Sequence, residues 1–154
     1  FTVPAPWVFS MRTAVVIALV LFGACAAQAH SYRIGNLEIV HPAIMVPQAN
    51  SDCTCAHVTI TNHGSETEYF LGADIEAASS TRLLHVAIRG LNISAPSIVA
   101  IAPGAKLDLH RHEWCLFLSD IPKGIEPDIG AYPARLMFRH AGTIAIEFMV
   151  DANQ

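Results

Sequence analysis

Short stretches in which apolar and polar residues alternate recur along most of the chain. In residues 37–41, for example, Leu37 and Ile39 alternate with Glu38. A period of two is the pattern of a β-strand that buries one face. The same pattern predicts further strands at 56–62, 69–73, 81–88, 97–101, 106–110, 114–119, 135–140 and 143–150. Turn-forming residues separate these segments and no long helix is predicted. We therefore expect an all-β sandwich or barrel of about nine short strands.

Two regions carry apolar residues that should form the core. Residues 81–88 are largely apolar on both faces, which predicts a central strand that is covered on each side. Strands 135–140 and 143–150 are expected to form a closing hairpin around Ala141 and Gly142. The second strand of this hairpin would line the core with Ile144, Ile146, Phe148 and Val150.

The N-terminal end departs from this alternation. Met11 opens the sequence M-R-T, which is followed by the apolar run A-V-V-I-A-L-V-L-F-G-A-C and, up to Ala29, by A-A-Q-A. A basic start, a short apolar run and a small-residue ending are typical of a secretory signal peptide, and the run is short for a bilayer span. We expect removal of residues 1–29, of which 1–10 precede the first plausible initiator. Residues 30–154 would then form one exported domain without a membrane span.

Charge and motif content bear on the class of function. The 154 residues include 9 Lys and Arg against 13 Asp and Glu, and the formal net charge is −4. This mildly acidic balance argues against a nucleic-acid partner. No Ser-His-Asp order, glycine-rich phosphate loop or HExxH pattern is present, so we do not expect an enzyme. His57 and His63 fall on an outward strand face and in a turn, and we expect both at the surface.

The cysteines leave several pairings open. Cys25 falls in the apolar run, but a lipid anchor there is disfavoured because Phe22 stands where a lipoprotein signal prefers Leu. Cys53, Cys55 and Cys115 follow residue 29. Their number is odd, so at least one is free, metal-bound or paired between chains. Cys53 and Cys55 could chelate a soft metal together, or one of them could form a disulfide with Cys115 in an exported protein.

Cleavage after Ala29 would make His30 the first residue of the mature protein. A free N-terminal amine next to an imidazole can chelate copper as a "histidine brace". Such a site also needs a distant partner histidine, which the sequence does not identify. The simpler interpretation is a loose terminus that happens to begin with histidine.

Several segments, taken in order, resemble the PCu(A)C family of periplasmic copper chaperones, also called DUF461. They are G-N-L-E-I-V-H-P, H-V-T-I-T-N-H-G-S-E-T-E-Y-F-L-G-A, I-A-P-G-A-K-L-D-L and A-G-T-I-A-I-E-F. No single segment is specific, but their order and spacing are, and together they cover essentially all of residues 30–154. The resemblance implies a cupredoxin-like Greek-key fold. It also implies Cu(I) held by two His and two Met, and copper delivery to the CuA centre of cytochrome c oxidase.

The family's ligand positions are altered in this chain. Its first His falls on His85, its second His on Cys115 and its following Met on Phe117, and residues 86–100 contain no Met. Imidazole, thioether and thiolate donors all suit Cu(I). The resemblance therefore implies copper bound by His85 and Cys115. A third donor would come from Met45, His110 or His112.

A second interpretation is a family member that has lost the metal and serves as a structural or protein-interaction module in the envelope. In that case His85 is a strand histidine satisfied by hydrogen bonds and Cys115 is a small buried residue. The family also usually has Trp and Arg after its His-Pro, where this chain has Ala43 and Met45. A cluster of His85, Cys115 and one more donor would favour copper binding, and a filled apolar pocket would favour its loss.

Overall fold

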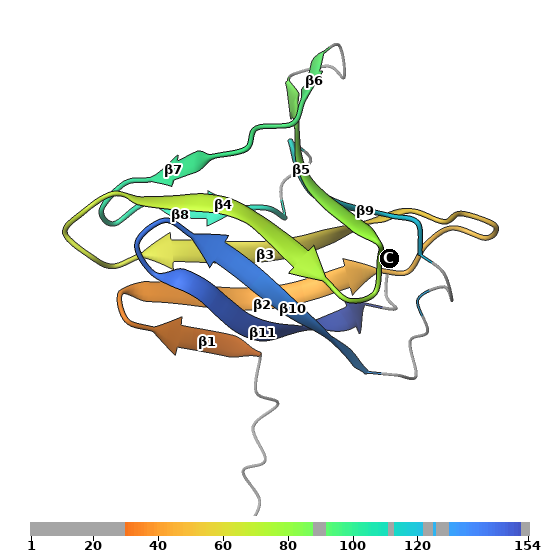
Figure 1. The fold of residues 1–154 in the computed structure, drawn as a ribbon, viewed down its shortest axis with the longest axis horizontal. Coiled ribbons are helices and arrows are strands. Elements are labelled where there is room, and N and C mark those ends of the chain that lie inside the picture. The colour runs from red at the N-terminus through yellow and green to blue at the C-terminus, as the bar shows by residue number, and fades with distance from the viewer. Residues whose placement is uncertain (1–29, 88–91, 111–112, 122–124, 126–129, 152–154) are drawn as a thin grey trace, which may run out of the picture.

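In the computed structural model, eleven β-strands form one curled, mixed sheet, and no helix occurs in the described residues 30–87, 92–110, 113–121, 125 and 130–151 (Figure 1). The strands are β1 Ser31–Ile34, β2 Leu37–Met45, β3 Thr54–Asn62, β4 Glu68–Ile75, β5 Ser80–Ala87, β6 Asn92–Ser94, β7 Val99–Ile101, β8 Lys106–Asp108, β9 Trp114–Ser119, β10 Ala131–Phe138 and β11 Gly142–Asp151. The all-β prediction is confirmed. The expected signal peptide and His112 lie outside the described residues.

Strands that are distant in the sequence lie side by side in the sheet. The order is β6-β5-β9-β3-β2-β11-β10-β4-β7, with β1 beside β2 and β8 beside β3. All pairs are antiparallel except β2 and β11, which run parallel. Long connections between non-consecutive neighbours are characteristic of Greek-key folds. In the described part of the chain, no helix has the length and apolar character that crossing a membrane would require.

The core fills the inside of the curled sheet with branched and aromatic side chains. Fully buried members from six strands include Ile39, Ile60, Phe70, Leu116, Leu136 and Phe148. Of the four residues expected on the inward face of the last strand, Ile144, Ile146 and Phe148 are buried, and Val150 is half-buried and packs against the core. Burying apolar surface stabilises a fold by about 25 cal/mol per Å², so this core is the main source of stability.

The prediction of a central strand at 81–88 is wrong. β5 is second from one end of the strand order, and the β5–β6 ribbon rises away from the rest of the sheet (Figure 1). Only Leu83 of β5 is buried, while Ile93 on β6 remains 66% exposed. The apolar residues on the outer part of β5 therefore have too few neighbours to be covered.

An irregularity in β2 shapes the sheet near the candidate site. The pairing of β2 with β3 shifts register between Val40 and Ala43, and His41 has a φ of 54°. This left-handed conformation is uncommon for residues other than glycine, and Pro42 has no N–H to donate to the ladder. β-Bulges of this kind change the direction of side chains and are over-represented next to functional sites.

Candidate metal centre

The family positions do not form a shared pocket in this chain. His85 on β5 lies opposite Trp114 on β9, and the centres of their rings are 4.3 Å apart. Cys115 follows Trp114 and lies opposite Leu84. Successive side chains of a strand point to opposite faces of the sheet. The side chains of His85 and Cys115 therefore face opposite sides and are not brought together as two donors.

Cys115 is part of a disulfide. Its sulfur is bonded to that of Cys55 across β9 and β3, with an S–S distance of 2.06 Å and a Cα–Cα distance of 5.5 Å. The structure thus selects one of the pairings that the sequence left open. The thiolate expected at Cys115 exists only when this bond is reduced. Cys53 keeps a free thiol, and its sulfur lies 3.4 Å from the Ser51 hydroxyl oxygen.

Met45 belongs to a different group of donors, which we call the histidine–methionine cluster and define as His41, Met45, His57 and His110. The thioether sulfur of Met45 lies 2.8 Å from Nε2 of His57. The His57 ring stacks on that of His110, with ring centres 5.4 Å apart and planes 17° apart. His41 meets His110 edge-on, with ring centres 6.3 Å apart.

The expectation that His57 is a surface residue is wrong. The His57 side chain is half-buried, because the turn that follows β8 continues alongside β3 and stacks the ring of His110 on that of His57. Nδ1 of His57 lies 2.8 Å from the carbonyl oxygen of Leu109 in this turn. His63 is exposed as expected and pairs with Glu38 at 2.7 Å.

The Leu109 carbonyl fixes the tautomer of His57. A carbonyl oxygen can only accept a hydrogen bond, so Nδ1 carries the proton. In the neutral ring Nε2 then keeps a lone pair, and that lone pair faces the sulfur of Met45, which is also an acceptor. A histidine that donates one ring N–H to a backbone carbonyl is the usual arrangement behind a metal-ligating nitrogen.

Backbone hydrogen bonds hold His110 in place. The prediction of a strand at 106–110 overestimates its length, because β8 ends at Asp108. The Leu109 N–H donates to the Val58 carbonyl at 2.9 Å, and the His110 N–H donates to the Asp108 carboxylate at 3.0 Å. Partial desolvation and then the charge of His57 lower the pKa of His110, against an opposing effect of Asp108. This lowering of the pKa favours the neutral ring of His110, which can donate a lone pair.

An open recess of about 490 Å³ adjoins the cluster. Its lining residues are His30, His41, Pro42, Ala43, His110, Met149, Val150 and Asp151. Ala43 lies between His57 on β3 and Met149 on β11, and its small side chain leaves this space open. The carbonyl of His30 accepts a hydrogen bond from the His41 N–H at 3.2 Å. His41 and His110 line the same recess as His30, so they are the candidate partner imidazoles for a brace at His30.

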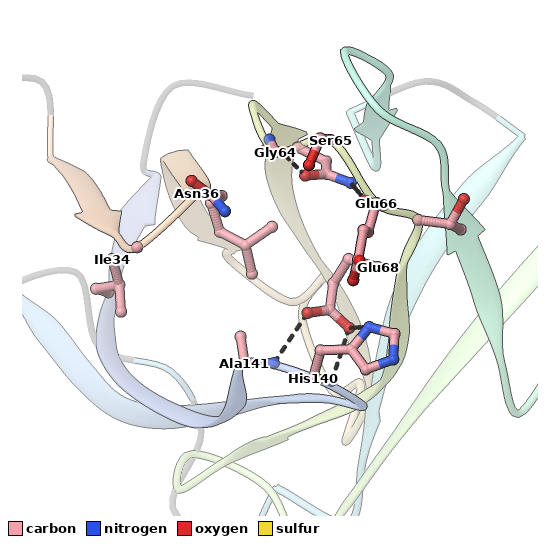
Figure 2. Close-up of a pocket in the computed structure, with 12 residues that line it drawn as sticks. Ile34, Asn36, Gly64, Ser65, Glu66, Glu68, His140 and Ala141 are labelled. Atoms are coloured by element: carbon pink, nitrogen blue, oxygen red, sulfur yellow. Dashed lines mark hydrogen bonds and ion pairs between the residues drawn. The ribbon is translucent and has the colours of Figure 1, made fainter.

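A second recess has a structural role (Figure 2). The carboxylate of Glu68 accepts hydrogen bonds from the backbone N–H groups of Tyr69, His140 and Ala141 at 2.8–2.9 Å. The side-chain amide of Asn62 donates to the carbonyl of Ile101 at 2.9 Å. Because these two side chains bond backbone groups of neighbouring turns and strands, we assign the recess to holding turns together.

Comparisons with known proteins identify the fold. No protein-family model matches the chain, and no curated protein sequence matches it significantly. Among solved structures, the copper-bound PCuAC domain from PmoF2 has a TM-score of 0.67 at 20% identity, covering 80% of this chain and 98% of that chain. The apo PCuAC domain from PmoF1 has a TM-score of 0.69 at 23% identity, with coverages of 80% and 99%. The CuI form of DR1885 from Deinococcus radiodurans has a TM-score of 0.62 at 16% identity, with coverages of 84% and 86%.

The curled, mixed sheet is that of a cupredoxin-like β-domain. More narrowly, it is the fold of PCuAC domains, as the resemblance of the sequence segments implies.

Proposed function

We propose that this protein binds copper and carries or buffers it as Cu(I), without catalytic turnover. The observation that carries the proposal is the shared fold with the copper-bound PCuAC domain from PmoF2, which extends over 98% of that domain. Imidazole and thioether donors, which suit Cu(I), are present together at Met45 and His57.

We further propose that the protein acts in the periplasm. The signal-peptide pattern before His30 supports this location, and so does the disulfide between Cys55 and Cys115, because disulfides persist in oxidising compartments. Copper would pass by ligand exchange to an acceptor, for which an assembly component of the CuA centre of cytochrome c oxidase is our candidate. Partly exposed donors such as His41 and His110 suit such an exchange.

A Cu(I) titration tests the proposed function. The full chain would be expressed, purified, and its N-terminus determined by mass spectrometry. The protein would then compete with a chromophoric Cu(I) chelator, with the Cys55–Cys115 disulfide intact and again after reduction. We expect one Cu(I) per chain in both states. Tighter binding after reduction would support a contribution from Cys115 at the family position. Absence of competition in both states would leave the metal-free envelope module as the better description.

The position of His30 favours a second candidate function, a copper-dependent redox protein. If processing exposes the amine of His30, that amine and the imidazoles of His41 and His110 lie around one recess. Nitrogen donors of this kind suit Cu(II). We expect a Cu(II) electron paramagnetic resonance spectrum with nitrogen couplings in the processed protein. A protein with one residue retained before His30 is the control, because its histidine would lack a free amine. Identical spectra would contradict the brace.

A further inference from the structure

Two lone pairs face each other in the histidine–methionine cluster. The Nδ1–H of His57 donates a hydrogen bond to the Leu109 carbonyl, so in the neutral form of the ring Nε2 offers only a lone pair. The Met45 sulfur, 2.8 Å away, has no proton to give. Two acceptors at this distance gain nothing from each other. A soft cation that accepts electron density from both would turn the contact into two bonds.

The neighbouring ring lies within reach of the same ion. A metal sits about 2 Å from a ligating nitrogen, and hence about 3 Å from the ring centre. Two imidazoles that share an ion therefore have ring centres up to about 6 Å apart. The separation between His57 and His110 is 5.4 Å, which falls within this limit, and the 6.3 Å between His41 and His110 lies at its edge.

Small side-chain rotations would complete the site. Among the described residues, no three His, Cys, Asp or Glu side chains already converge on one point. The ring of His110 must therefore turn before its nitrogen and Nε2 of His57 point to one ion. The recess beside Ala43 provides room for this movement, while the Leu109 carbonyl keeps the His57 proton on Nδ1.

We propose that Cu(I) binds between Met45 and His57, with His110 as the third donor, and not at the family position around His85. The inference rests on the proposed copper function and assigns its site. Two nitrogens and one thioether form a soft, neutral donor set that suits Cu(I). His41, at the exposed edge of the cluster, is placed to receive the ion during transfer.

The family position offers a poorer set. The ring of His85 packs against Trp114, and the sulfur of Cys115 is held in a disulfide on the opposite face. The described residues of this region, together with the sequence 86–100, contain no methionine. Met45 stands where the family usually has Arg, so a positive charge is replaced by a donor at the cluster.

Cu(I) affinities of matched variants test the proposal. The donor variants are Met45→Leu, which keeps size and hydrophobicity, His110→Ala, and His57→Asn. In His57→Asn, the side-chain NH₂ can still donate a hydrogen bond to the Leu109 carbonyl, but the donor atom Nε2 is lost. We expect each to weaken Cu(I) binding at least about tenfold in competition with the chelator. The controls are His85→Asn at the family position and Met137→Leu on β10, which should bind within about twofold of wild type.

A measurement on the wild-type protein avoids dependence on the folding of variants. With methionine methyl groups labelled with ¹³C, one equivalent of Cu(I) should shift the Met45 resonance and leave that of Met137 unchanged. If the wild type binds Cu(I) but Met45 does not shift, and His85→Asn alone loses affinity, the assignment is overturned while the copper function stands. If the wild type binds no Cu(I), both the assignment of the site and the proposed copper function are wrong.

Discussion

The carboxylate of Glu68, at the start of β4, accepts hydrogen bonds from the backbone N–H groups of Tyr69, His140 and Ala141. Two of these donors belong to the turn between β10 and β11, so one side chain joins two parts of the sheet. Burial raises the pKa of Glu68, but the hydrogen bonds from the backbone outweigh it, and the net pKa is lowered. The charged carboxylate is therefore the form that the fold requires.

Replacing Glu68 with glutamine should destabilise the protein. Hydrogen bonds to a charged acceptor contribute more than neutral ones, so we expect the free energy of unfolding to fall by about 2 kcal/mol at pH 7. Because the folded pKa lies below the ordinary value of 4.5, the stabilisation is complete above that pH and is lost as the pH falls through the folded pKa. Urea unfolding of wild type and Glu68→Gln between pH 7 and pH 3 measures both effects.

Glu38→Gln is the control for this experiment. A hydrogen bond from His63 lowers the pKa of Glu38 as well, but the pair is exposed to solvent. Exposed ion pairs contribute little to stability. We therefore expect Glu38→Gln to unfold like wild type at pH 7. Equal losses in the two variants would show that Glu68 has no special role.

The surroundings of His57 could not be predicted from the residues next to it in the sequence. The alternation in H-V-T-I-T correctly places its side chain on the face opposite Val58 and Ile60. On that face His57 contacts the turn at Leu109 and His110, about fifty residues later in the chain, and no local pattern indicates the contact. The sequence did carry one signal for the recess beside His57. Ala43 is a small residue where the family usually has Trp, and it leaves an open space.

At the scale of the elements, the Cys55–Cys115 disulfide joins β3 to β9 across a loop of 60 residues. Closing a loop of this length removes entropy from the unfolded chain worth about 4 kcal/mol. We expect Cys55→Ser, Cys115→Ser and the double variant to lose similar amounts of unfolding free energy, within about 2–5 kcal/mol. Urea unfolding with and without reductant measures this loss, and reductant should reduce the wild type to the level of the variants.

Cys53→Ser is the matched control, because Cys53 lies two residues before Cys55 and its thiol is free. It should unfold like wild type, and its stability should fall on reduction as the wild type's does. If Cys53→Ser lost as much free energy of unfolding as Cys55→Ser, both Cys53 and Cys55 would take part in disulfide bonds in solution.

Strand prediction succeeded where burial and alternation agree and failed where long-range pairing creates the strand. β2, β3, β4, β9 and β11 were all located by their periodicity. β1 and β6 were missed because they are short and almost wholly exposed, and they exist through pairing with β2 and β5. β10 begins at Ala131, before Pro133 and four residues earlier than the strand predicted at 135–140. Tertiary pairing overrides local propensity at such positions.

At the scale of the whole molecule, the fold could be predicted because the order of many weak segments is more specific than any one of them. The proposed copper site could not be predicted in the same way. Its donors come from β2, β3 and the turn after β8, so their proximity depends on the path of the sheet. The family positions pointed to His85 and Cys115, whose side chains face opposite sides here.

The parallel pairing of β2 with β11 joins the first long strand of the sheet to the last. A force that pulls the two ends of the chain apart would load this pair in shear, so that its hydrogen bonds must break together and not one after another. Four residues of this pairing, Ala43 on β2 and Met149, Val150 and Asp151 on β11, line the recess beside the histidine–methionine cluster. A pair of strands arranged to resist mechanical extension therefore also keeps the recess in shape.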